Sequence, residues 1–180
     1  MLKEILLKKK SAILKKWYNE ILYAYSDDTS RFFKREKDRF HNPVGYTFTH
    51  EIEVIFDELL NESFSEELSK SLDNIIRIRA IQEFSASQAI SFIFILKKIL
   101  REELKNTIKE KSFDEQMLKL EIKIDDLALY SFDIYMQCRE KMYDIKAREA
   151  KRSVSNLLRK ANLIYEIPEF EEDLKEGKQH

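Results

Sequence analysis

Six side chains that could take part in chemistry lie between positions 125 and 139 of the sequence: Asp125, Asp126, Asp133, Tyr135, Cys138 and Arg139. Tyr135 and Arg139 are four residues apart, a spacing at which side chains meet on one face of a helix. Carboxylates, a phenol, a thiol and a guanidinium in one place can line a ligand pocket, or they can form a buried polar network with arginines from another helix. We favour the network, which we assign to Arg77, Arg79, Asp133, Tyr135, Cys138 and Arg139.

Cys138 is the only cysteine of the chain, so it cannot form an internal disulfide and cannot by itself hold a structural zinc ion. The neighbouring Arg139 favours the thiolate form, which makes a redox sensor one interpretation of this residue. A small buried apolar side chain is the commoner role of a free cysteine. A single cysteine fits a reducing compartment, so we expect the protein to be cytoplasmic.

The three histidines, His41, His50 and His180, predict neither a metal site nor a haem site. A two-iron carboxylate bundle uses Glu-x-x-His on two helices, but the residues three before His41 and His50 are Asp38 and Thr47. A haem pocket needs a proximal histidine on a helix that lines the pocket, whereas His41 lies beside a predicted turn. We therefore expect no cofactor.

The composition excludes most enzyme architectures. With 2 glycines and 2 prolines in 180 residues, the chain has no phosphate-binding loop and no nucleophile elbow. Charged residues make up 36% of the chain and apolar residues 43%, which favours long amphipathic helices. The 32 basic and 33 acidic side chains produce no net field that attracts nucleic acid. We expect no catalytic activity, no catalytic residue and no nucleic-acid partner.

Apolar residues recur at helical spacings over most of the chain and predict an all-α fold. The expected long helices cover residues 2–24, 47–61, 65–82, 86–100 and 112–163, with a short basic helix around 31–38. Asn42-Pro43-Val44-Gly45 is expected to be an ordered turn. The 65–82 helix is expected to carry Arg77 and Arg79 on its polar face.

Ser85 and Gln88 have the spacing of a capping box at the start of the most apolar helix. We expect this helix to be the central element of the core and to bury Phe92, Phe94, Leu96 and Ile99.

The second half of the last predicted helix narrows to a seam of small and apolar residues spaced 4-3-4-3-4: Tyr143, Ala147, Ala150, Val154, Leu157 and Ala161. This heptad spacing predicts a paired helix, and we expect a homodimer that uses the seam. Residues 163–180 carry six acidic and two basic side chains and are expected to form an irregular tail after a single domain over residues 1–162.

Residues 1–24 combine an apolar face, which includes Trp17, with six lysines before it. Such a helix can lie on an anionic membrane surface, although core packing with a solvated lysine face is the commoner arrangement. The longest apolar run, residues 92–96, has five residues, so we expect no transmembrane segment.

One segment is more specific than these signals: Arg77-Ile78-Arg79-Ala80-Ile81-Gln82-Glu83-Phe84-Ser85-Ala86-Ser87-Gln88. Together with Asn42-Pro43-Val44-Gly45 before it, and Asp133-Ile134-Tyr135 and Cys138-Arg139-Glu140 after it, the segment resembles the N-terminal domain of RsbRD-type RsbT co-antagonist proteins. The resemblance covers about residues 10–161. It implies a globin-like, haem-free sensory module of the stressosome-related kind, which dimerises and passes a signal along its last helix. No βαβ segment for a STAS domain follows, so the resemblance implies a stand-alone protein.

The expected fold is an all-α, globin-like helical bundle with a long C-terminal helix. The expected function is that of a non-catalytic cytoplasmic sensor or regulator, which acts through homodimerisation and an unidentified protein partner in stress or redox signalling. Two alternatives stay open: a small-ligand or Cys138-based redox sensor, and an accessory subunit of a larger, membrane-associated complex.

Overall fold

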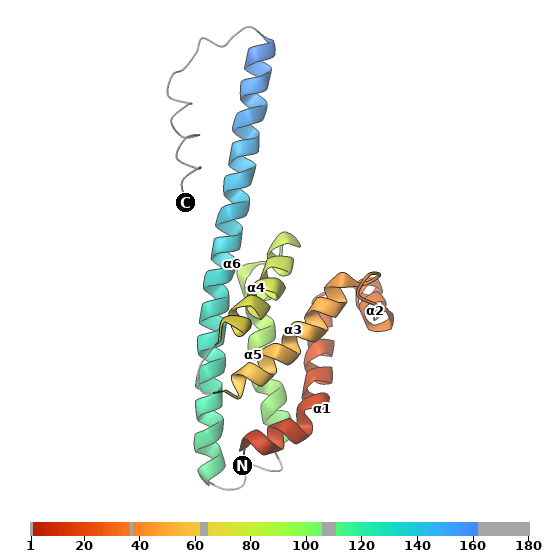
Figure 1. Ribbon diagram of the computed structural model, residues 1–180, viewed down its shortest axis with the longest axis vertical. Coiled ribbons are helices and arrows are strands. Elements are labelled where there is room, and N and C mark those ends of the chain that lie inside the picture. Colours follow the sequence, from red (N-terminus) through yellow and green to blue (C-terminus); the bar gives the residue numbers. More distant parts are fainter. Residues whose placement is uncertain (1, 37, 62–64, 106–110, 162–180) are drawn as a thin grey trace. The chain divides into compact units, whose positions relative to one another are not determined.

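The computed structural model describes residues 2–36, 38–61, 65–105 and 111–161, and confirms the all-α class. No strand occurs within these ranges. The helices are α1 (Leu2–Leu22), α2 (Asp27–Arg35), α3 (Pro43–Leu59), α4 (Glu66–Ile81), α5 (Ala86–Leu104) and α6 (Lys111–Lys160). Figure 1 shows their order along the chain. The expected acidic tail, residues 163–180, lies outside the described residues.

The chain divides into two compact units, residues 1–139 and residues 140–180. The first unit holds α1 to α5 and the first part of α6, and the second holds the rest of α6. The single domain over residues 1–162 stays a prediction, since α6 crosses the boundary without interruption. None of the described helices has the length and apolar character needed to span a membrane.

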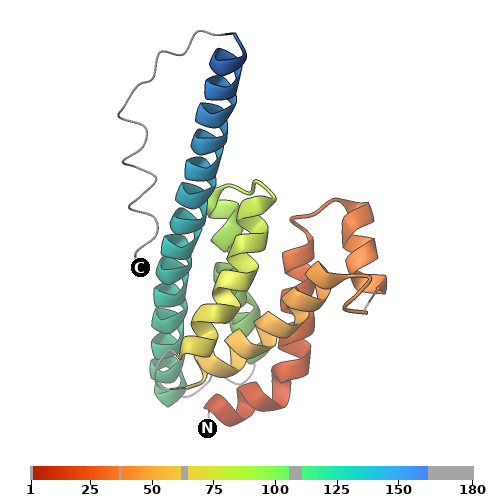
Figure 2. The same cartoon turned by 45° about the horizontal axis from the view of Figure 1, so that its top comes forward.

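The core of the first unit forms where α1 packs against α5, and α3 packs against α1 and α4 (Figures 1 and 2). Trp17 and Phe92 join α1 and α5 through stacked rings with centroids 6.0 Å apart. The Trp17 indole Nε1 also donates a 2.7 Å hydrogen bond to the Phe92 carbonyl oxygen. Both side chains are fully buried, so the apolar face of α1 is occupied by the core rather than available to a membrane surface.

Short polar side chains cap four of the helices. Ser26, Asn42, Ser65 and Ser85 each accept a hydrogen bond from a backbone N–H in the first turn. The capping box predicted at Ser85 and Gln88 is confirmed, because both reciprocal hydrogen bonds are present. These caps define where the chain stops turning and a helix begins.

The turn expected at residues 42–45 is instead the start of α3, four residues before the predicted start at Thr47. Asn42 is the N-cap and Pro43 is the first helical residue, where a proline loses no hydrogen bond. The Asn42 side chain is 1% exposed and also donates to the carbonyl oxygens of Phe33 and Glu36. It therefore ties the start of α3 to the end of α2.

Gly45 is required by this cap and not by a special backbone angle. A Cβ atom at Gly45 would lie 2.2 Å from the Asn42 amide nitrogen, closer than any real contact. The Gly45 N–H itself donates a 2.8 Å hydrogen bond to the Asn42 side-chain oxygen. The missing side chain makes room for the capping amide.

The expected burial of α5 is confirmed for Phe92, Leu96 and Ile99 and is wrong for Phe94, which is 47% exposed. Phe94 lies two residues from Phe92, about 200° around the helix axis. The neighbouring helices cover the Phe92 side of α5, and Phe94 is left on the solvent side although its residue type is the same.

In the first unit, α6 is buried on one side only. Buried positions include Phe113, Ile124, Leu127, Ile134 and Tyr135. The opposite side exposes Leu118, Ile122, Leu129, Phe132 and Met136. Residues 113–136 of α6 are apolar on both sides of the helix, but the described chain covers only one of these sides.

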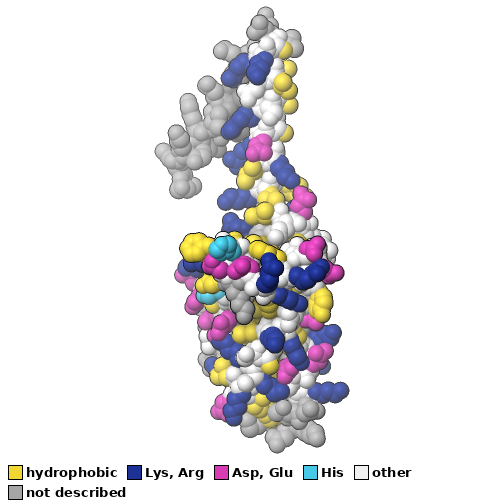
Figure 3. Space-filling model, turned by 90° about the vertical axis from the view of Figure 1, so that its right-hand side faces the viewer, with side chains coloured by type: hydrophobic (Ala, Val, Ile, Leu, Met, Phe, Trp, Pro, Cys, Tyr) yellow, Lys and Arg dark blue, Asp and Glu magenta, His cyan; other side chains and the backbone are white. Residues whose placement is uncertain are grey.

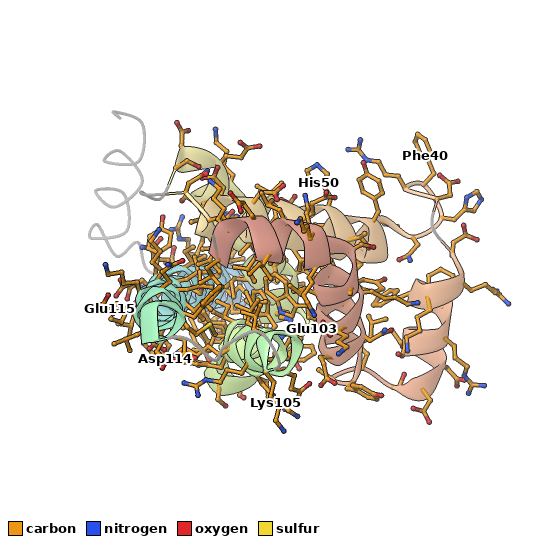
Figure 4. All side chains as sticks on the ribbon, turned by 90° about the horizontal axis from the view of Figure 1, so that it is seen from below. Phe40, His50, Glu103, Lys105, Asp114 and Glu115 are labelled. Atoms are coloured by element: carbon orange, nitrogen blue, oxygen red, sulfur yellow. The ribbon has the colours of Figure 1, made fainter. Side chains whose placement is uncertain are left out.

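Acidic and basic side chains are interspersed over the lower part of the face shown in Figure 3. Several of the lysines of α1 are paired with carboxylates. Lys9 and Lys16 both reach Glu103 of α5, and Lys10 lies 2.8 Å from Glu53 and from Asp57 of α3. Figure 4 shows Glu103 between α1 and α5.

Candidate functional site

The corner between α4 and α5 is organised around Arg79, which is 1% exposed. This is a correction to the sequence prediction, which placed Arg79 on a polar face beside Arg77. The Arg79 Nη1 atom donates hydrogen bonds to the carbonyl oxygens of Gln88, at 2.8 Å, and Ala89, at 3.3 Å. Its Nε atom has no acceptor among the described residues.

Three aromatic rings surround the Arg79 guanidinium. Its central carbon lies 5.1 Å from the ring centroid of Phe92, 5.3 Å from that of Phe84 and 5.9 Å from that of Phe48. These rings belong to α5, the corner and α3, so one cation contacts three parts of the fold. Ring faces attract cations, and the attraction is stronger where water is excluded.

Burial lowers the pKa of the Arg79 guanidinium, because desolvation disfavours its charged form. Burial also raises the pKa of Tyr25 to about 12, and the nearby charge of Arg79 opposes that increase. The Tyr25 hydroxyl donates to the side-chain oxygen of Gln82, at 2.8 Å. Arginine stays protonated in proteins, so the corner holds a permanent positive charge beside a neutral phenol.

The backbone of the corner turns through a left-handed residue, Glu83, whose φ is 62°. The Phe84 N–H donates a 3.1 Å hydrogen bond back to the Arg79 carbonyl oxygen, which closes the end of α4. Ser85 then caps α5 two residues after Glu83. The left-handed conformation is uncommon for a residue with a side chain, and the hydrogen bonds on both sides of Glu83 hold it.

Tyr135 connects this corner to α6. Its hydroxyl donates a 2.7 Å hydrogen bond to the Phe84 carbonyl oxygen, and its side chain is 6% exposed. Tyr135 is also the last buried residue of α6, since every described residue from Met136 to Ala161 is exposed or half-buried. The hydrogen bond therefore lies where α6 stops contributing to the core.

The structure brings together only part of the predicted network. Arg79 and Tyr135 meet at the corner through Phe84. Arg77 is turned to solvent and forms a bidentate ion pair with Asp73, which raises its pKa. Asp133 is exposed, so no predicted carboxylate compensates Arg79.

Cys138 and Arg139 are half-buried, at the end of the first unit. Asp73 makes the largest contribution to the raised Arg77 pKa, and the negative charge of the Cys138 thiolate form makes a smaller one, so α4 and α6 approach each other here. The residues that sequence reasoning missed are Tyr25, Phe48 and Phe84. Phe84 and Gln82 belong to the segment of residues 77–88 that carries the family resemblance. Their residue types did not indicate that aromatic rings and backbone carbonyl oxygens would bind Arg79.

The predicted seam of the second unit is exposed throughout. Tyr143, Val154 and Leu157 are 59%, 54% and 67% exposed, and Ala147, Ala150 and Ala161 are also exposed. Leu158 beside the seam is 40% exposed. This stretch of helix therefore carries an apolar stripe that the described chain does not cover.

The described residues contain no group of three or more histidine, cysteine or acidic side chains placed to hold a metal ion. At the corner, the Arg79 Nη1 atom and the Tyr135 hydroxyl donate to backbone carbonyl oxygens, and the Arg79 Nε atom has no acceptor among the described residues. The described fold is therefore an α-helical bundle whose last helix, α6, continues beyond the core with an uncovered apolar stripe.

Comparisons with known proteins identify the family. The sequence profile of the RsbT co-antagonist protein RsbRD N-terminal domain matches residues 11–150, and the chain belongs to this family of stress-signalling regulatory domains. The chain is also similar to a protein of Archaeoglobus fulgidus described as an "Uncharacterized protein", with 31% identity over 111 residues, 60% of this chain and 69% of the other. No solved structure shows a significant match.

Proposed function

We infer that the chain is a non-catalytic, cytoplasmic regulatory domain that forms a homodimer through the seam of α6 and passes a stress signal to a protein partner. Membership of the RsbRD N-terminal family supports the regulatory role. The observation that carries the dimer is the exposure of all six seam residues: Tyr143, Ala147, Ala150, Val154, Leu157 and Ala161.

An isolated helix with such a stripe is marginal in water, and a partner helix that covers the stripe stabilises it. Three of the six seam residues are alanines, so two helix backbones can approach closely at these positions. From residue 139 to residue 160 the helix carries eight basic and three acidic side chains. Repulsion between like charges opposes pairing, and apolar contact in the seam has to exceed it.

The position of Tyr135 suggests how the signal passes. A change at the α4–α5 corner alters the hydrogen bond from Tyr135 to Phe84, and this bond holds α6 just before its exposed part begins. The corner and α6 then have two states, with the Tyr135–Phe84 hydrogen bond formed or broken. A partner or ligand that binds one state more tightly shifts the equilibrium toward it.

The test is the oligomeric state of the purified chain, measured by sedimentation equilibrium over about 1–100 µM, the range in which weak dimers dissociate. Wild type should be dimeric at the upper end, and Val154→Glu should be monomeric. Asn156→Glu is the matched control, because it adds the same charge about 200° around the helix from Val154. A monomeric wild type overturns the dimer, and equal behaviour of the two variants overturns the seam as its interface.

A further inference from the structure

A pocket of about 440 Å³ lies between α3 and α4, and none of the seam residues lines it. We call it the α3–α4 pocket; the residues that matter here are Arg39, Tyr46, His50, Glu51, Arg77 and Ile81. Its volume is within the range of about 300–1,000 Å³ that is typical of small-molecule sites. All of its residues belong to the first unit.

One wall of the pocket is a stack of three flat groups. The Arg39 guanidinium lies 5.6 Å from the Tyr46 ring centroid, and the Tyr46 ring stacks on the His50 ring at 6.2 Å with an angle of 16°. Tyr46 and His50 are one helical turn apart on α3, and Figure 4 shows His50 at the outer edge of this helix. Tyr46 is 40% exposed, so part of this stack is accessible to a ligand.

The other wall is apolar. Ile78 and Ile81 of α4 line it, and Ile81 is 62% exposed although it is a large aliphatic residue at the end of a helix. A planar apolar body between the Tyr46 and His50 rings and the Ile81 side chain would remove this surface from water.

The charges of the lining are unequal: two guanidinium groups face one carboxylate. Glu51 is already held, because Asn74 donates a 2.9 Å hydrogen bond to one of its oxygens and His50 lies 3.7 Å from the other. Arg77 is paired with Asp73. Arg39 forms no ion pair among the described residues, and its guanidinium lies over the Tyr46 ring. An anion is the ligand that Arg39 can bind bidentately.

A second pocket of similar volume, between α1, α2 and α3, lacks this imbalance. Its charged lining residues are Lys15, Lys34, Glu36 and Glu53, two of each sign. The comparison selects the α3–α4 pocket as the place for an anionic ligand.

We propose that the α3–α4 pocket binds a small monocarboxylate with a planar apolar body, with the carboxylate on Arg39 and the body between the ring stack and Ile81. This extends the proposed function by naming the class of signal that the domain senses. The ligand proposal and the dimer proposal can fail independently, because one is tested by ligand binding and the other by oligomeric state.

The test is an NMR titration of the uniformly ¹⁵N-labelled chain with phenylacetate. Phenylacetamide serves as the uncharged analogue, and acetate serves as the anion that lacks the aromatic ring. Phenylacetate should bind saturably and shift amide signals of α3 and α4, and both analogues should bind at least about tenfold more weakly, the loss expected for one charge-assisted hydrogen bond or one buried ring. Equal binding of either analogue, or no saturable binding of phenylacetate up to about 10 mM, a limit below which even weak fragments register, overturns the proposal.

Variants locate the site. Arg39→Ala should weaken phenylacetate binding by about tenfold, and Ile81→Glu should abolish it by placing a carboxylate in the pocket. Arg31→Ala is the matched control, since Arg31 is an exposed arginine of α2 that pairs with Asp28 outside the pocket. Undiminished binding by Arg39→Ala, or equal losses in Arg39→Ala and Arg31→Ala, contradicts the assignment. A binding result of either kind leaves the sedimentation test of the dimer unaffected.

Discussion

The hydroxyl group of Tyr135 lies 2.7 Å from the carbonyl oxygen of Phe84, although the two residues are 51 positions apart in the sequence. This contact joins α6 to the corner between α4 and α5. Phe84 also lies against Arg79, so the corner, the buried cation and α6 share one residue. The segment of residues 77–88 and the Asp133-Ile134-Tyr135 motif, which are far apart in the sequence, are therefore in contact in the structure.

Tyr135→Phe should lower the free energy of unfolding by about 0.5–1.5 kcal/mol, because it removes one hydrogen bond and little apolar contact. Chemical denaturation of the variant and wild type measures the difference. Tyr23→Phe is the control, since Tyr23 is 77% exposed and its change should be within about 0.5 kcal/mol of zero. Equal effects of the two substitutions would show that the Tyr135 bond contributes nothing to stability.

Arg79→Ala should destabilise the fold by about 2–5 kcal/mol, because it leaves a cavity among three rings and removes two hydrogen bonds. Arg77→Ala, two residues away, removes only an exposed ion pair and should cost about 0.2–1 kcal/mol. Thermal unfolding of both variants at one protein concentration separates them. If Arg77→Ala proved the more damaging, the structural role assigned to Arg79 would be wrong.

Gly45→Ala should destabilise the protein, although alanine usually favours a helix interior by about 0.5–1 kcal/mol. The added Cβ displaces the Asn42 amide and with it a cap worth about 0.5–2 kcal/mol. The mechanism is checked with Asn42→Ala and the double variant, by denaturant unfolding. The double variant should be little worse than either single one, because both remove the same cap, and additive losses would contradict it.

Phe92→Ala should cost about 3–5 kcal/mol, the range for a fully buried phenylalanine. Phe94→Ala, on the same helix, should cost less than about 1.5 kcal/mol because Phe94 is 47% exposed. Urea denaturation of the two variants gives the comparison. A loss below about 1 kcal/mol for Phe92→Ala is incompatible with its place in the core.

Glu103 should make stability depend on pH in the acid range. Hydrogen bonds from Lys16 and Lys9 lower its pKa below the ordinary value of 4.5, so the folded state binds the carboxylate's proton less readily than the unfolded state does. The stabilisation is present above pH 4.5 and is lost as the pH falls through the lower folded-state pKa. The stability gap between wild type and Glu103→Gln should therefore be largest at neutral pH and close on acidification.

The matched control for this pH dependence is Glu102→Gln, because the Glu102 side chain is 53% exposed and its ion pair, with Lys98, is long at 4.0 Å. Thermal unfolding over a series of acidic and neutral buffers tests both variants. A gap for Glu103→Gln that is constant with pH, or the same profile for both variants, would exclude the proposed linkage.

The sequence by itself determined the local structure of this protein. The hydroxyl of Ser85 and the side chain of Gln88 are within reach of each other whatever surrounds them, so their capping box could be predicted from spacing. Ser65 caps α4 for the same reason. The start of α3 was missed because Asn42-Pro43 signals both a turn and a helix N-terminus, and only the structure shows that the chain continues as a helix.

Tertiary structure alone decided which side chains became buried. In a helix that is apolar around most of its circumference, the sequence does not distinguish Phe92 from Phe94 as a core residue. The neighbouring helices cover only Phe92. Arg79 was expected in a polar network with Asp133, but its partners are carbonyl oxygens and aromatic rings from three parts of the chain. Every residue has a carbonyl group, so residue types cannot reveal such partners. The reason is physical: capping energies act within one helical turn, whereas burial depends on which distant segments pack on a position.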